Sequence, residues 1–271
     1  MNREKTNEPS ANLPIQTVIL AGGKGRRLLP YTTSFPKPLM PLGDRPILEI
    51  ILRQLARDGF CDITLAVGHL ASLIEAYFGR GTACGVRLSY LREDAPLGTA
   101  GPLAGIPNPP ENLLVLNGDI LTDLNFARIV ETHQKNRAAA TIMTIVQKVP
   151  IDYGVLTTDE YGYVLSYEEK PQLTTEVSGG VYVFSRRALK FIPRGEHFDF
   201  PDLVQTLLDR GEIVATHRHN TYWLDIGRRD DYQLATDLFE KHGELFLKPT
   251  PGGTRCSSTE AIPAVDRPPT W

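Results

Sequence analysis

The segment after the first apolar run of this sequence has the composition of a phosphate-binding loop. The run Thr17–Ala21 leads into the glycine-rich stretch 22–25, and Arg26 and Arg27 come next. Glycines at such a position let backbone N–H groups approach phosphate oxygens with no side chain in the way. On the glycines alone, a structural turn or a dinucleotide-binding loop explains the pattern equally well. The residues that follow lack the third glycine of a dinucleotide fingerprint, which favours another kind of phosphate site.

Two aspartates at the ends of distant apolar runs could hold a divalent metal ion. Asp119 follows the run 113–116, and Asp225 follows 222–224. Mg²⁺ prefers octahedral oxygen coordination and takes one or two carboxylates, with water and phosphate at its other positions. Either aspartate alone is more simply explained as a residue that closes a turn. The hypothesis therefore requires that the two lie together. His217 and His219 alternate along one expected strand and lack a third ligand, so we expect an exposed pair there.

The elements that must position these residues alternate along the chain in the manner of an α/β protein. Short apolar runs predict strands, and helical spacing of apolar residues predicts the helices between them. We expect a Rossmann-like, mostly parallel mixed sheet with helices on both faces, and a smaller β-rich lobe after Pro150. Strands are expected at 17–21, 63–67, 86–91, 113–116, 139–146, 153–157, 164–168, 181–184, 213–216 and 222–224. Helices are expected from Pro46 to Gly59 and at 70–78, 126–135, 200–210 and 229–241.

The two ends of the chain differ from its middle. Residues 1–13 are polar, and residues 246–271 are rich in Pro, Gly and Ser without periodicity. We therefore expect a flexible N-terminal tail at 1–13, one catalytic domain at 14–245 and a C-terminal tail at 246–271.

At this point the sequence resembles a known family. Residues 20–39, from Leu20-Ala-Gly-Gly to Pro36-Lys-Pro-Leu39, are similar to the motif L-A-G-G-x-G-T-R-L-x-P-x-T-x-x-x-P-K-P-L. This motif opens the sugar-1-phosphate nucleotidyltransferases, also called nucleoside-diphosphate-sugar pyrophosphorylases. These enzymes join a nucleoside triphosphate to a sugar-1-phosphate and release pyrophosphate. One departure is Arg26, where the family has Thr; its charge is either an extra contact for the triphosphate or a solvated loop charge.

The resemblance implies roles for individual residues. Catalysis would fall to Arg27, Lys37, Asp119 and Lys170. The nucleotide would contact Leu20, Ala21, Gly22, Gly23, Gly25, Gly98 and Thr99. The metal, Mg²⁺, would be held by Asp119 and Asp225. The sugar phosphate would contact Gly154, Glu169, Lys170 and Ser178, the last of which replaces the family's usual Asn.

The sequence of the segment Pro96-Leu-Gly-Thr-Ala-Gly-Pro102 most resembles the corresponding segment of mannose-1-phosphate guanylyltransferases. We therefore expect GTP with mannose-1-phosphate or a related sugar phosphate, such as heptose-1-phosphate. A glucose-1-phosphate thymidylyl- or uridylyltransferase remains an alternative, as does a non-catalytic regulatory paralogue that binds nucleotide sugars. The chain after the expected domain has no room for the C-terminal β-helix of some family members, so none is expected. The resemblance also implies a homo-oligomer.

The bulk composition excludes some partners. The formal net charge is −3 and the pI is near 6.1, so no overall basic field would attract a nucleic acid or an anionic membrane. The N-terminal residues lack the apolar core of a secretory signal. The three cysteines are scattered and include no Cys-x-x-Cys pair, as is usual for proteins of the reducing cytoplasm. We therefore expect a cytoplasmic protein.

Overall fold

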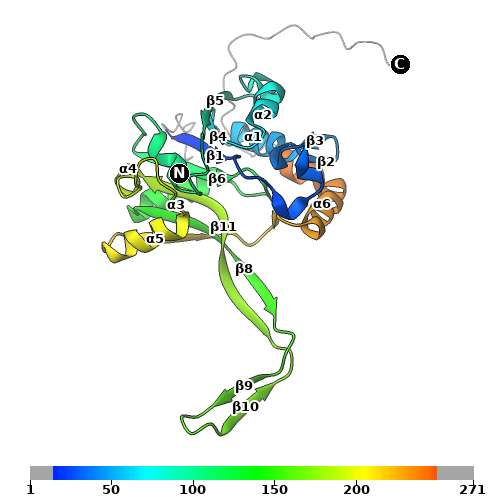
Figure 1. The fold of residues 1–271 in the computed structure, drawn as a ribbon, viewed down its shortest axis with the longest axis vertical. Coiled ribbons are helices and arrows are strands. Elements are labelled where there is room, and N and C mark those ends of the chain that lie inside the picture. Colours follow the sequence, from blue (N-terminus) through cyan, green and yellow to red (C-terminus); the bar gives the residue numbers. More distant parts are fainter. Residues whose placement is uncertain (1–14, 249–271) are drawn as a thin grey trace, which may run out of the picture.

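A seven-stranded sheet forms the centre of the molecule in the computed structural model, which describes residues 15–248 (Figure 1). Its strand order is β12-β8-β11-β6-β1-β4-β5. All neighbouring strands are parallel except at β11, which is antiparallel to both β6 and β8. The strands are β1 Gln16–Leu20, β4 Asp62–Val67, β5 Arg87–Arg92, β6 Asn112–Asn117, β8 Ala140–Pro150, β11 Gln172–Ser185 and β12 Val214–Arg218.

Helices cover both faces of this sheet because its strands are apolar on both sides. Neighbouring residues of β1 show this, since Val18 belongs to one buried core and Ile19 to the other. On the Ile19 side lie α1 Ile47–Arg57, α2 Ala71–Phe78, α3 Phe126–Asn136 and α6 Arg229–Leu247. On the Val18 side lie α4 Arg186–Leu189, α5 Phe200–Asp209 and the 3₁₀ helix η5 Gly101–Gly105. The predicted α/β fold with helices on both faces is confirmed.

Short strand pairs and 3₁₀ turns complete the body. The antiparallel strand pair of β7 Ile120–Thr122 and β13 Trp223–Asp225 joins two segments that are far apart in sequence. The second small pair is β2 Pro41–Leu42 with β3 Arg45–Pro46. Four further 3₁₀ turns are η1 Arg26–Leu28, η2 Tyr31–Thr33, η3 Lys37–Leu39 and η4 Thr82–Cys84. No helix among residues 15–248 is long and apolar enough to cross a membrane.

A long two-stranded arm leaves the body at the same sheet (Figure 1). The outer halves of β8 and β11 pair from Ser178↔Thr144 to Gln172↔Pro150. Beyond them, β9 Val155–Thr158 and β10 Val164–Glu168 form an exposed hairpin. We call the paired stretches 144–150 and 172–178, together with this hairpin, the arm, and residues 151–171 the arm tip.

The second half of the chain differs from the sequence-based expectation in its packing. Two of the strands expected in the lobe after Pro150, β11 and β12, instead complete the central sheet beside β8. The β-rich part that stands apart is the arm. The last helix is also longer than the spacing predicts: α6 continues to Leu247, with Phe246 buried in the main core.

Candidate active site

A cavity of about 700 Å³ opens at the carboxyl ends of β1, β4, β5 and β6. Parallel strands bring the loops that follow them to one edge, which is where open α/β sheets bind ligands. Eight of the residues proposed from the sequence line this cavity: Leu20, Ala21, Gly22, Gly23, Lys37, Gly98, Thr99 and Asp119. Arg26, the departure from the family motif, lines it as well.

The loop after β1 needs glycine at two positions. A Cβ on Gly22 would come within 2.9 Å of Glu93 Oε1 and 3.3 Å of the backbone N of Gly68. Gly25 has φ of 59°, a left-handed conformation that favours glycine. Thr32 Oγ1 donates to the Gly25 carbonyl at 2.8 Å and so holds the loop closed. Gly25 itself is outside the cavity lining, so the structure places it as a turn residue of the loop.

The β7–β13 strand pair brings Asp119 and Asp225 together across more than a hundred residues of sequence. Asp225 pairs with Ile120, the neighbour of Asp119. The backbone N–H of Ile226 donates to the Asp119 carbonyl at 3.0 Å. The two aspartates proposed as metal ligands therefore lie together at one corner of the cleft, where Asp119 lines the cavity and Asp225 does not.

Two cations lie against this pair of carboxylates. The Lys37 ammonium donates to Asp119 Oδ2 and lies 4.0 Å from Asp225 Oδ1. A Cβ built on Gly227 would contact both Arg27 Nη2, at 3.1 Å, and Asp225 Oδ2, at 3.2 Å, so Arg27 reaches the same corner from η1. Burial raises the pKa of Asp225, and the nearby Asp119 raises it further, while Lys37 and Arg27 oppose both effects.

The donor set of this corner fits a hard divalent cation. Asp119 Oδ1 is buried and has no hydrogen-bond partner, which is costly for a carboxylate oxygen. No group of three or more His, Cys, Asp or Glu side chains among the described residues could hold a metal. Two carboxylates, with phosphate and water completing the shell, are the arrangement that Mg²⁺ commonly accepts.

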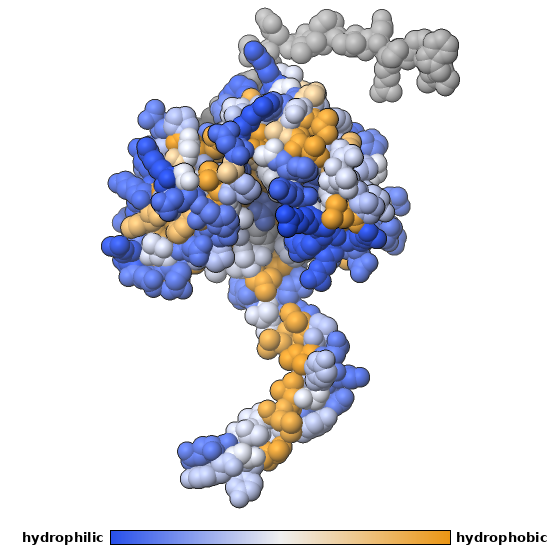
Figure 2. Space-filling view, in the orientation of Figure 1, coloured by the Kyte–Doolittle hydropathy of each residue, from blue (hydrophilic) through white to orange (hydrophobic). Residues whose placement is uncertain are grey.

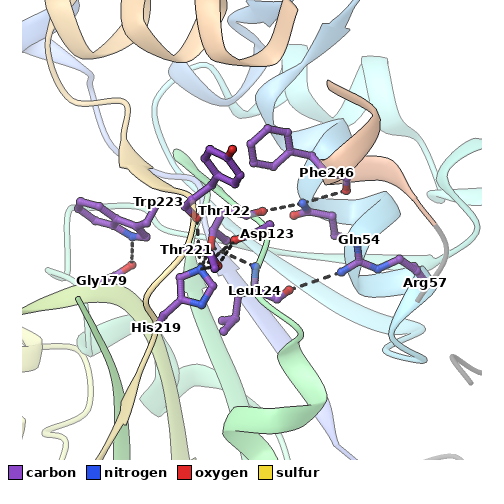
Figure 3. A network of polar contacts seen from close by, with 11 residues as sticks. Gln54, Arg57, Thr122, Asp123, Leu124, Gly179, His219, Thr221, Trp223 and Phe246 are labelled. Carbon is purple, nitrogen blue, oxygen red and sulfur yellow. Dashed lines mark hydrogen bonds and ion pairs between the residues drawn. The ribbon is translucent and has the colours of Figure 1, made fainter. Parts of the chain in front are cut away.

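A polar network stabilises the β7–β13 strand pair, which positions the two aspartates (Figure 3). Gln54 of α1 is buried and donates through Nε2 to the carbonyls of Thr122, at 2.7 Å, and Phe246, at 3.0 Å. His219 Nε2 lies 3.0 Å from Asp123 Oδ1 and 3.3 Å from Thr122 Oγ1. The network therefore links β7 to α1, to the residue that follows β12 and, through Gln54, to α6.

The expectation of an exposed histidine pair is wrong. His219 is largely buried and contacts Asp123, and His217 Nδ1 lies 2.8 Å from Thr132 Oγ1 on α3. Both imidazoles are used to join segments of the fold. Sequence spacing could not show this because the partners lie more than eighty residues away.

The cavity is also lined by an acidic side chain that sequence reasoning missed, beside Gly22 of the glycine-rich loop. Glu93 follows β5, and its Oε2 accepts from the backbone N–H of Leu97 at 3.1 Å. Burial raises the pKa of Glu93, and the Leu97 bond opposes that rise. Asp94, His69 and His197 also line the cavity. A glutamate in a polar loop has no sequence signal of its own, and only the fold shows that it faces the cavity.

Gly98 and Thr99 line the cavity and also stabilise the fold around it. Gly98 has φ of 80°, and a Cβ there would come within 2.6 Å of the Phe198 carbonyl. The Thr99 hydroxyl bonds to Asp199 Oδ1 at 3.0 Å and accepts from the N–H of Phe200 at 2.8 Å. It therefore caps the start of α5, and its hydroxyl is already engaged.

The residues expected on the sugar side are not brought together with the cleft. Ser178 lies at the root of the arm, where its hydroxyl is 2.9 Å from the Tyr182 hydroxyl. Gly154, Glu169 and Lys170 lie on the exposed arm tip, where Tyr167 donates to the Glu169 carboxylate. None of the four lines the cavity. Within one chain, the cleft therefore holds the nucleotide-side residues without the sugar-side ones.

Comparison with known proteins gives one family match. The family described as "Nucleotidyl transferase" matches residues 16–242. A UTP–glucose-1-phosphate uridylyltransferase from Synechocystis is 37% identical over 82% of this chain. A mannose-1-phosphate guanylyltransferase from Mycobacterium tuberculosis is 33% identical over 80% of it. The matched region spans 62% of the length of each of these two relatives.

Solved structures share the fold. HddC from Yersinia pseudotuberculosis superposes with a TM-score of 0.65, at 25% identity, over 83% of this chain and 99% of that chain. The same protein complexed with GMP-PN superposes with a TM-score of 0.63, at 26% identity, over the same shares of both chains.

Proposed function

This chain belongs to the nucleotidyl transferase family, and from that premise we propose that it transfers a nucleotidyl group from a nucleoside triphosphate to a sugar-1-phosphate. Pyrophosphate is the second product. The observation that supports this proposal is the convergence of Asp119, Asp225, Lys37 and Arg27 beside a glycine-rich loop.

The chemistry needs cations more than it needs a base. A sugar-1-phosphate carries nearly two negative charges at pH 7, so its oxygen is already an anionic nucleophile. The obstacle is its repulsion by the triphosphate. Phosphoryl-type transfers overcome such repulsion by positioning and by fixed positive charge. Arg27 and Lys37 supply that charge, and the backbone N–H groups of the glycine-rich loop orient the phosphates. We expect in-line displacement at the α-phosphorus without a covalent enzyme intermediate.

We propose Mg²⁺ as the metal, held by Asp119 and Asp225. A bound divalent ion would neutralise charge that develops on the phosphates. The unpartnered Asp119 Oδ1 and the raised pKa of Asp225 support this assignment, because the first is an oxygen free to ligate a metal and the second shows that two buried carboxylates repel each other despite Lys37 and Arg27.

We propose GTP as the nucleotide. Guanine presents two donors side by side, N1–H and the N2 amino group, and the carboxylate of Glu93 can accept from both. Uracil and thymine present one N–H between two carbonyl oxygens, which a carboxylate repels. The HddC complex with GMP-PN and the guanylyltransferase relative agree with this choice. The uridylyltransferase relative keeps UTP as the competing substrate.

For the acceptor we propose mannose-1-phosphate or a related sugar phosphate, with glucose-1-phosphate as the alternative. Gly154, Glu169, Lys170 and Ser178 remain the proposed sugar contacts; all four belong to the arm, the first three to its tip. We also propose 14–245 as the catalytic domain. A non-catalytic paralogue is disfavoured because Arg27, Lys37, Asp119, Lys170 and Asp225 are all present.

A substrate panel tests the proposal directly. The full chain is mixed with Mg²⁺, each of GTP, UTP, dTTP, ATP and CTP, and a set of sugar-1-phosphates, and pyrophosphate release is measured. We expect release with GTP and mannose-1-phosphate, and none with Asp225→Asn. Release with UTP or dTTP alone would overturn the base assignment. Tight nucleotide-sugar binding with no release from any pair would favour the regulatory paralogue.

A further inference from the structure

The arm places the sugar-side residues out of reach of their own cleft. The β8–β11 pairs run without interruption from Ser178↔Thr144 to Gln172↔Pro150. At about 3.3 Å per residue, this stretch puts the arm tip roughly 20 Å beyond its root. A lysine side chain spans only about 6 Å, by its bond geometry. Lys170 therefore cannot contact the corner held by Asp119 in this conformation.

The direction of the arm is fixed at its root. Trp223 Nε1 donates to the Gly179 carbonyl at 2.8 Å, and the N–H of His219 donates to the Thr144 carbonyl at 2.8 Å. Glu176 accepts from Thr144 and from Arg218 Nη2, the latter at 2.7 Å. A swing of the arm onto its own cleft would break these bonds. The arm is thus built to point away from the body that bears it.

The surface of the arm tip is that of a contact region. Tyr153, Tyr161, Tyr163 and Tyr167 are each more than 60% exposed, and Leu165 is 66% exposed. Figure 2 shows hydrophobic residues running along the arm. Tyrosines are enriched where proteins meet, and an isolated two-stranded hairpin is marginally stable in water. The arm tip therefore requires a partner surface.

The body carries a matching surface beside its cleft. Leu29, Tyr31 and Phe35 are exposed in the loop that follows Arg26 and Arg27. Charge also matches: the arm tip has five acidic residues and one lysine, which gives −5 + 1 = −4. The cleft loop adds exposed cations at Lys24, Arg26 and Arg27. A tyrosine-rich acidic tip suits an apolar, basic receiving loop.

We propose that two copies of this chain exchange arms, so that the arm tip of each docks on loop 29–35 of the other and delivers Glu169 and Lys170 to the other's cleft. A two-fold pair makes such an exchange closed and reciprocal. The inference rests on the proposed function for the roles of these two side chains. Each active site then consists of the body of one copy and the arm of its partner.

Complementation between two inactive variants tests the exchange. Arg27→Ala damages a body and Lys170→Ala damages an arm tip, and both side chains are exposed, so both variants should fold. The two are co-expressed with different tags, and pyrophosphate release is measured on the mixture. In a mixed dimer, one site combines an intact body with an intact arm. Statistical mixing then restores about a quarter of wild-type activity.

The matched control is a mixture of Arg27→Ala with Asp225→Asn, two body lesions, which should restore nothing. Double-tag purification shows whether mixed dimers form. No recovery by mixed dimers of the first pair, or a wild-type chain that is monomeric and active, would overturn the exchange. Failure of the proposed function looks different, because the wild-type chain would then release no pyrophosphate from any substrate pair.

Discussion

At the scale of single residues, the site holds two aspartates in unequal surroundings. Asp119 is paired with Lys37, which is 9% exposed, whereas Asp225 lies at a longer distance from the same ammonium. The two carboxylates also repel each other, and this contributes to the raised pKa of Asp225. Their substitution should therefore affect activity alike and stability oppositely.

We predict that Asp225→Asn raises the melting temperature of the metal-free protein at pH 7 and abolishes activity. The substitution removes a carboxylate whose charged form the folded state disfavours. Asp119→Asn should instead lower the free energy of unfolding by about 1–3 kcal/mol, because it leaves the buried Lys37 without its partner. Thermal and urea unfolding in EDTA measure both effects. Equal destabilisation by the two variants would contradict this account.

A second residue-scale prediction concerns Glu93. Glu93→Gln replaces one acceptor oxygen with a donor, so a base with two adjacent donors loses one bond and meets a donor instead. A well-placed pair of base contacts is worth about 1–3 kcal/mol, so the KM for GTP should rise about five- to 150-fold. Glu111→Gln, at an exposed carboxylate outside the cavity lining, is the matched control and should change it little. An unaltered preference for GTP in Glu93→Gln would rule Glu93 out as the base contact.

At the scale of elements, α3 is attached to the sheet through a buried histidine. His133 lies 2.9 Å from Thr141 Oγ1 of β8 and 3.1 Å from Asn112 Oδ1 of β6. Burial lowers the pKa of His133 to about 4 from its usual 6.5, with a smaller contribution from Arg187. The imidazole is therefore neutral in the folded protein.

This low pKa predicts a loss of stability in acid. Below pH 6.5 the unfolded chain takes up a proton that the folded chain refuses until the pH nears 4, so stability should fall across this range. His133→Gln should be less stable than wild type at pH 7 but should show a weaker dependence between pH 6.5 and 4. Urea unfolding at a series of pH values gives both curves. Parallel curves would show that another group controls the acid limb.

Much of the element scale could be predicted from the sequence, and the exceptions have physical causes. The strands at 17–21 and 113–116 could be predicted because a buried parallel strand is a continuous apolar run. The strand β7 is three residues long and follows Asp119 directly, too short for any period to show. The outer half of β11 was not predicted because the polar residues Gln172, Thr174 and Glu176 interrupt it and leave no continuous apolar run.

At the scale of the whole molecule, the body and the arm are separable. The residues proposed for the nucleotide, except Gly25, line a cavity in the body, and the residues proposed for the sugar phosphate lie on the arm. The sequence predicted both sets of residues. It could not predict their separation, since the direction of the arm depends on contacts between distant segments, such as Trp223 with Gly179.

Removal of the arm tip should therefore separate binding from turnover. We predict that replacing residues 151–171 with an Asn-Gly turn leaves the Kd for GTP within about threefold of wild type, because no cavity residue is touched. Sugar-nucleotide synthesis should be lost. Calorimetric titration of GTP and the pyrophosphate assay provide the two measurements. Loss of GTP binding in a folded variant would show that the arm also forms part of the nucleotide pocket.

The pairing of β7 with β13 sets an order of events during synthesis of the chain. The glycine-rich loop and Asp119 leave the ribosome early, and β7 can pair only when β13 follows about a hundred residues later. Gln54 must also wait for Phe246 before its amide has both partners. An incomplete chain thus already has a surface that attracts phosphates but lacks the second carboxylate. With Asp225 as the proposed second metal ligand, we expect a chain that ends before residue 225 to release no pyrophosphate.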